Sequence, residues 1–434
     1  MMAVIHGGPA RSAIRASRWI SAIALLLSWS ARIGNSQETS TAILFDGDRV
    51  PASLVEISEN WTSQWKTNAG IRRLDASQLV RWGAFRDSSQ GTITALASGS
   101  VLRGVVTGLS ASELTLRSDV FTDVRIERRN VRGVVWRPPA NAIQRDQLVL
   151  SLFNEKRSHD TLWTTNGDEL AGEVTSVNDV AQSATMTMEV AQLAVISRAG
   201  TEPLLTDIGN VVAIGLTSVA KAITTQQPFG VIGLSDGDRL WTRNISMQGD
   251  QTHLTLLDDT VLVADTATLL ARVTAIQVFS SHVAYISDLS NLTHKHIPFL
   301  STAWGYGVDR NVLGGMLRCQ GNLYPKGIGM HSIARLACSL DSRYQRFEAD
   351  IALDDAVGSR GSVIFRVYAE RSRARDTDSS WQVIYESPVV RGGDSPLPIS
   401  VDVVGAQRLA LVVDLADRGD EGDHANWLNA RLIR

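Results

Sequence analysis

The sequence predicts an all-β protein in which repeated small antiparallel barrels or sheets are followed by a β-sandwich. Residues 41–280 carry Asp-Gly and Asn-Gly turns between alternating segments, the strongest short-range signal for a β-hairpin. Residues 283–434 contain at least six short strand-like runs, which favours a two-sheet sandwich or jelly roll. Helical periodicity is scarce in both parts. A doubly wound α/β domain is therefore not expected.

The length and charge of the chain limit its architecture and partners. Its 434 residues allow two to four domains of about 100–200 residues each. Forty-two Lys and Arg oppose 45 Asp and Glu, which gives a formal net charge of −3. This balance does not require a large basic surface, so nucleic acid is not an expected partner.

The first 36 residues have the order of a secretory signal. Arg11, Arg15 and Arg18 precede an apolar run over residues 19–29, and small residues follow up to Ser36. The apolar run is shorter than the roughly 20 residues that a membrane-spanning helix needs. The sequence is compatible both with cleavage of this segment and with its retention as a membrane anchor. No later apolar run approaches spanning length, so we expect a mature chain without a transmembrane segment that is secreted, periplasmic or at the cell surface.

Residues 41–280 contain a weak internal repeat whose opening phrase is a turn followed by an alternating strand. The turn glycines are Gly47, Gly99, Gly167 and Gly237, separated by 52, 68 and 70 residues. We expect two β-units over 41–137 and two more over 161–280, each opening at one of these turns. The role expected for these units is that of a spacer or of a surface for a protein partner.

A linker with a short helix is expected between the two pairs of units, over residues 138–160. Pro138 and Pro139 stop the preceding strand, and the apolar residues from Ile143 to Phe153 fit one face of a helix.

Five separated phrases stand out in the last 150 or so residues: LYPKGIGMHS (323–332), YQRFEA (344–349), GSVIFRVY (361–368), SVDVVGA (400–406) and DHANWLNARL (423–432). In order and spacing they resemble the NPCBM family of carbohydrate-binding modules. The resemblance covers about a third of the chain and implies a galactose-binding-like β-sandwich over residues 283–434. This sequence departs from the family at Asn426 and Asn429, where aspartate is usual, and at Ala352, where a glycine is usual.

A sugar site is expected on two loops of this sandwich. Sugar binding needs an aromatic face and a few fixed polar groups for the hydroxyls. The loop before the final strand offers these groups together in Asp423, His424, Asn426 and Trp427. The other loop offers the imidazole of His331 beside glycines. The alternative is that Trp427 fills the sandwich core while Asp423 and His424 hold the loop by hydrogen bonds.

Cys319 and Cys338 are the two cysteines of the chain. Two thiols cannot form a closed zinc site, which takes four ligands. In an oxidising compartment they are candidates for a disulfide, and the alternative is two separate buried thiols.

The resemblance also implies a structural calcium ion, because sandwiches of the galactose-binding type often carry one. Asp354 and Asp355 are the adjacent acidic pair before the central strand and are the candidate ligands. The alternative is a solvated turn.

Catalytic signals are weak in this sequence. The nucleophile elbow, the zinc-type histidine pair and the phosphate-binding loop are missing from it, and the acids of residues 41–280 lie mostly in turns. We therefore expect an exported, non-catalytic protein that binds a glycan. The alternatives are a structural protein that mediates protein contacts, or an unrecognised glycoside hydrolase domain within 41–280.

Overall fold

The computed structural model describes residues 40–178, 192–197, 203–217, 223, 225–298, 302–371 and 380–434. The predicted signal segment, 1–36, lies outside these residues. The all-β fold class is confirmed, because antiparallel strands dominate both parts of the chain. Among the residues described, no helix is long and apolar enough to cross a membrane.

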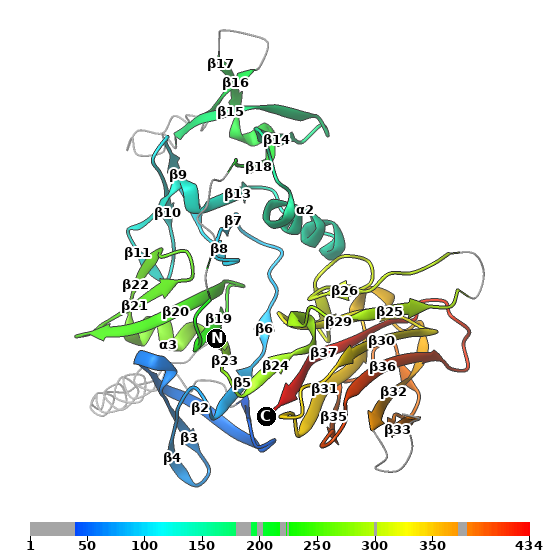
Figure 1. Ribbon diagram of the computed structural model, residues 1–434. Helices are drawn as coiled ribbons and strands as arrows, with labels where there is room; N and C mark the ends of the chain where they lie inside the picture. Colours follow the sequence, from blue (N-terminus) through cyan, green and yellow to red (C-terminus); the bar gives the residue numbers. More distant parts are fainter. Residues whose placement is uncertain are drawn as a thin grey trace, which may run out of the picture. The chain divides into compact units, whose positions relative to one another are not determined.

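The first β-unit has five antiparallel strands. The strands are β1 (Ser40–Leu44), β2 (Arg49–Ile57), β3 (Ser63–Thr67), β4 (Gly70–Leu74) and β5 (Leu79–Gly83). Strands β1 to β4 pair in chain order, and β5 returns to pair with β1. The unit is thereby folded back on itself as a small, partly closed sheet (Figure 1).

Three further segments have the same arrangement, in which the last strand pairs antiparallel with the first. The second holds β7 (Ile93–Leu96), β8 (Val101–Arg103), β9 (Val105–Leu109), β10 (Glu113–Arg117), β11 (Phe121–Thr122), β12 (Val124–Glu127) and β13 (Val131–Val135). The third holds β14 (Asp160–Thr164), β15 (Glu169–Asn178), β16 (Gln192–Ser197), β17 (Pro203–Asp207) and β18 (Val211–Gly215). The fourth holds β19 (Phe229–Leu234), β20 (Arg239–Gln248), β21 (Gln251–Leu256), β22 (Val261–Asp265), α3 (Thr266–Arg272) and β23 (Val273–Phe279).

The same tight turn joins the first two strands of each unit. In all four, the turn glycine donates its N–H to the carbonyl three residues earlier. The φ angles of Gly47, Gly99, Gly167 and Gly237 lie between 87° and 98°. That backbone region is open to glycine and strained for other residues, which explains why the sequence marks the turns so clearly.

The four units pair through their last strands. β5 pairs with β23, so the first unit joins the fourth, and β13 pairs with β18, so the second joins the third. Helix α2 (Ala142–Asn154) lies between the second and third units and confirms the helix expected there. Asn141 caps it by accepting the N–H of Gln144, and its Val149 and Leu152 pack in a buried cluster with strands β7 and β13.

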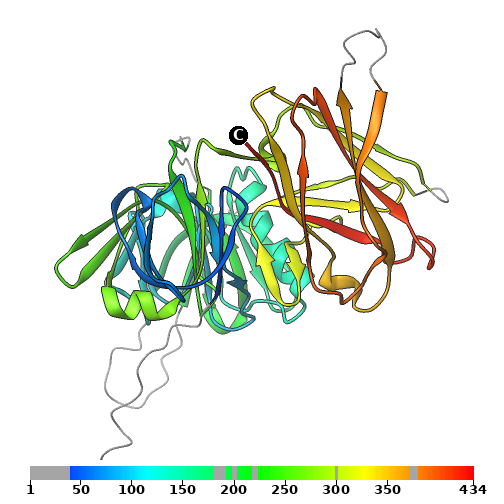
Figure 2. The ribbon, with the colours of Figure 1, turned by 90° about the horizontal axis from the view of Figure 1, so that it is seen from below.

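The C-terminal part is a sandwich of two antiparallel sheets (Figure 2). One sheet contains β24 (Val283–Tyr285), β26 (Gly307–Val308), β29 (Gly327–His331), β31 (Arg346–Leu353), β35 (Leu397–Asp402) and β37 (His424–Ile433). The other contains β25 (Thr293–His296), β30 (Ala334–Ser339), β32 (Ser362–Arg371), β33 (Ser380–Glu386), β34 (Val390–Arg391) and β36 (Arg408–Leu415). Phe347, Phe365 and Trp427 are fully buried between the sheets.

The sandwich is joined to the β-units by strand pairing and by ion pairs. β6 (Phe85–Arg86) pairs with β28 (Asn322–Tyr324), which in turn pairs with β27 (Leu317–Cys319). The buried carboxylate of Asp350 accepts from Arg81 at 2.6 Å and from Arg49 at 3.2 Å. These contacts are long-range in sequence, so local patterns could not predict them.

Both cysteines are free, buried thiols. Cys319 packs in a small cluster with Leu317 and Leu428, whereas Cys338 belongs to the main sandwich core. Of the two interpretations that the sequence left open, the structure shows separate buried thiols rather than a disulfide.

Candidate functional site

Three histidines meet at one end of the sandwich. β29 ends at His331 and β37 begins at His424, and these two residues are paired in register. His296 is the last residue of β25, which belongs to the opposite sheet. The end of the sandwich therefore gathers imidazoles from both sheets, and we call this place the histidine rim: His296, Trp304, His331, Asp423 and His424.

Trp304 provides the aromatic ring of the histidine rim. Its indole is stacked parallel on His331, with ring centroids 4.7 Å apart, and lies 5.7 Å from the ring of His424. The Trp304 backbone N–H donates to Nδ1 of His296 at 3.2 Å, which ties this segment to the end of β25. The indole is half-buried, so part of its surface is open to a ligand.

Trp304 was missed in the sequence analysis. It lies in an irregular segment outside the phrases that carry the family resemblance, and its partner His331 is far away in the chain. The signal available was a tryptophan next to a glycine in a polar stretch before the sandwich, Trp304-Gly305.

The imidazoles of His331 and His424 are uncharged at neutral pH. Burial, the neighbouring His331 and Arg360 lower the pKa of His424 to about 4. Burial also lowers the pKa of His331, although a hydrogen bond with the Ser332 backbone acts to raise it. A neutral imidazole has one donor and one acceptor nitrogen, which suits a hydroxyl group. Nδ1 of His424 is buried and has no hydrogen-bond partner among the described residues.

Asp423 holds the loop before β37. Its side chain is fully buried, and Oδ1 accepts the backbone N–H of Ser362 at 2.9 Å. Burial raises the pKa of Asp423 to about 6, although the Ser362 N–H and the Ser332 hydroxyl oppose this rise. Asp423 is thus an internal support of the rim that carries a charge at pH 7.

Two of the expected site residues lie away from the histidine rim surface. Trp427 is fully buried and meets Phe365 edge-to-face with centroids 4.9 Å apart, so it fills the core as the alternative interpretation had it. Asn426 is also buried and donates from Nδ2 to Asp354 at 2.7 Å. Neighbouring side chains of a strand point to opposite faces of the sheet, so Trp427 faces the sandwich core and Asn426 faces the other side, and both faces of β37 are covered.

Asp354 and Asp355 do not fit a calcium site. The Asp354 carboxylate accepts from N–H groups of Asn311, Arg318, Ala356 and Asn426. The Asp355 carboxylate accepts the backbone N–H groups of Gln320 and Gly321, both at 2.8 Å. Calcium needs six to eight oxygen ligands, and these oxygens are already directed at donors. Within the described ranges no cluster of three or more His, Cys, Asp or Glu could hold a metal ion.

Comparison with known families identifies the sandwich. Residues 282–433 match the family model of the NPCBM/NEW2 domain. The resemblance that the sequence phrases indicated is therefore confirmed for this part of the chain, and the match leaves residues 41–280 unassigned.

A curated relative and several solved structures are similar to parts of the chain. The relative is a Renibacterium salmoninarum protein named "Putative endo-alpha-N-acetylgalactosaminidase", 28% identical over 117 residues, which are 27% of this chain and 7% of that protein. The CBM51 module of a Clostridium perfringens GH95 protein, solved with methyl-galactose, is 22% identical and covers 35% of this chain and 99% of its own, with a TM-score of 0.28. Tandem CBM51 modules of a Streptococcus pneumoniae family 98 glycoside hydrolase are 12% identical and cover 63% and 87%, with a TM-score of 0.29.

Proposed function

We propose that this chain is an exported, non-catalytic glycan-binding protein whose NPCBM/NEW2 domain contacts sugar at the histidine rim. The observation that carries the proposal is the half-buried Trp304 beside the neutral imidazoles of His331 and His424. The family match over residues 282–433 supports carbohydrate binding by this domain.

The chemistry of the rim suits a sugar ring. One face of a pyranose is lined by C–H groups and packs on an aromatic ring, while its hydroxyls need donors and acceptors at fixed positions. Trp304 offers the aromatic surface, and the half-buried, neutral imidazole of His424, whose ring lies 5.7 Å from the indole, offers a polar group beside it.

Export and the role of the β-units are part of the same proposal. The signal-like order of residues 1–36 supports transport to the periplasm, cell surface or medium. The β-units contact the sandwich through Asp350 and through β6, which supports a role as its scaffold. The curated relative bears the name of a glycan-cleaving enzyme, and the aligned segment is 7% of its length.

A glycan array with the full mature chain tests this function. We expect wild type to bind a defined set of glycans and Trp304→Ala to lose that binding. Trp381→Ala is the matched control, because Trp381 is a half-exposed tryptophan of the same domain that lies on β33 under Arg408 rather than at the rim. Equal array signals for Trp304→Ala and wild type, with both folded, would show that the sugar site lies elsewhere.

A further inference from the structure

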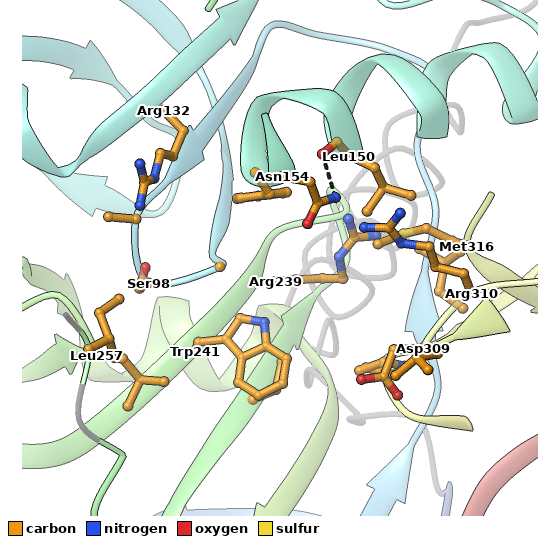
Figure 3. A pocket seen from close by; sticks show the side chains of 18 of the residues that line it. Ser98, Arg132, Leu150, Asn154, Arg239, Trp241, Leu257, Asp309, Arg310 and Met316 are labelled. Carbon is orange, nitrogen blue, oxygen red and sulfur yellow. Dashed lines mark hydrogen bonds between the residues drawn. The ribbon is translucent and has the colours of Figure 1, made fainter. Parts of the chain in front are cut away.

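A cavity lies between the β-units, helix α2 and a loop of the sandwich. Its volume is about 610 Å³, within the range of small-molecule sites. Its wall includes Trp241 of β20, Asn154 of α2 and Met316 of the sandwich. Figure 3 shows side chains from all three regions around the same space. It involves none of the residues of the histidine rim.

Three arginines line this cavity: Arg132, Arg239 and Arg310. Within the part of the chain that the structure describes, none of the three forms an ion pair with a carboxylate. Figure 3 shows the side chains of Arg239 and Arg310 projecting toward the end of α2 that carries Asn154. Arg132 lies on the other side of the cavity in this view. Two guanidinium groups that point into one cavity without a carboxylate repel each other, and an anion between Arg239 and Arg310 removes that repulsion.

The acidic side chains near the cavity form ion pairs with cations other than the three arginines. Asp309, the acid among the lining residues that are described, accepts from Lys326 at 2.6 Å and from the backbone N–H of Gly327. Asp146 pairs with Arg318 at 2.6 Å. These acids therefore form no ion pair with the three arginines of the cavity.

The charged guanidinium of Arg239 is partly removed from water by burial. Burial lowers its pKa to about 10, and Asp146 and Asp87 act in the opposite direction without contacting it. The side chain therefore stays protonated at neutral pH. A guanidinium held in a desolvated position without a paired anion is costly, so its presence points to a ligand of opposite charge.

The remaining wall suits a ring rather than a bare ion. Trp241 is half-buried and is held by Phe279, with ring centroids 5.4 Å apart. Leu257, Met316 and Leu323 add apolar surface. An inorganic anion would use the arginines and leave this surface unoccupied.

We propose that this cavity binds an acidic sugar, a saccharide ring that carries a carboxylate. The planar guanidinium groups pair with the carboxylate, since their donor fork matches its two oxygens. Trp241 packs on the apolar face of the ring. The cavity is a second binding site, independent of the glycan binding proposed for the histidine rim.

Binding is tested with the full mature chain and three probes: sodium glucuronate, glucose and sodium sulfate at matched ionic strength. Isothermal titration and thermal melts measure binding to wild type, Arg310→Gln and Arg239→Gln. We expect glucuronate to bind and to raise the melting temperature, and each arginine variant to weaken it about tenfold or more. Arg125→Gln is the control, because it removes the same charge from an exposed position on β12.

The melts without ligand separate a binding role from a structural one. Because Arg310 has no carboxylate partner among the described residues, Arg310→Gln should not lower the melting temperature of the ligand-free chain. Trp304→Ala should leave glucuronate binding unchanged, so failure of the rim proposal does not affect this result. The proposal would be overturned if glucose or sulfate bound to wild type as tightly as glucuronate. It would also be overturned if both arginine variants bound glucuronate as tightly as Arg125→Gln.

Discussion

The ion pair that joins the sandwich to the first β-unit is expected to be essential for stability. Asp350 is on β31 with a side chain 5% exposed, and its partner Arg81 on β5 is 18% exposed. Asp350→Asn removes the negative charge and leaves Arg81 facing Arg49 without a carboxylate between them. Removing one partner of a buried ion pair costs about 3–5 kcal/mol. Arg49 is 42% exposed and can be rehydrated, so we expect the lower end, about 3 kcal/mol.

Urea unfolding followed by tryptophan fluorescence measures this loss. Glu113→Gln is the control, because its pair with Arg125 is exposed and should contribute less than about 1 kcal/mol. Burial raises the pKa of Asp350, but Arg81, Arg431 and Arg49 outweigh burial and lower it. The stability from Asp350 is therefore present above its unfolded pKa and is lost as pH falls through its folded pKa. A loss for Asp350→Asn no larger than that of the control at pH 7 would refute the reasoning.

Three further predictions concern the sandwich. Trp427→Ala should destabilise the protein by about 3–5 kcal/mol in the same urea assay, since the indole is fully buried, whereas a loss below about 1 kcal/mol would contradict its core position. Asp423→Asn should stabilise the chain by at most about 3 kcal/mol at pH 8 and by about half of that at pH 5, because the stability of wild type is lost as pH rises through the folded pKa of about 6; a pH-independent effect would contradict this. Burial raises the pKa of both cysteines to about 12, so a thiol reagent should label them after unfolding and not in the native protein.

The sequence predicted the features that depend on local chemistry. The four glycine turns were visible because only glycine adopts their positive φ without strain. Helix α2 was visible from its periodicity and the prolines before it. The sandwich was visible as a set of alternating strands together with family phrases, and residues 282–433 match that family.

The features that depend on distant contacts could not be predicted. Trp427 and Trp304 have the same side chain, but one fills the core and the other lies at the rim, and only the packing of β37 against Phe365 decides this. Asn426 was expected at the sugar and instead donates to Asp354, 72 residues away in the chain. The arginine-lined cavity takes its residues from many separate segments between residues 97 and 325, and no local pattern connects them.

The most direct test of the histidine rim is the affinity of His424→Ala for the glycan that the array selects. Isothermal titration compares it with wild type and with Trp381→Ala, and a thermal melt confirms that each variant is folded. If the sugar contacts the rim, His424→Ala should bind about tenfold more weakly, which corresponds to the roughly 1.4 kcal/mol of one lost hydrogen bond, while Trp381→Ala binds like wild type. Unchanged affinity of a folded His424→Ala would contradict sugar binding at the rim.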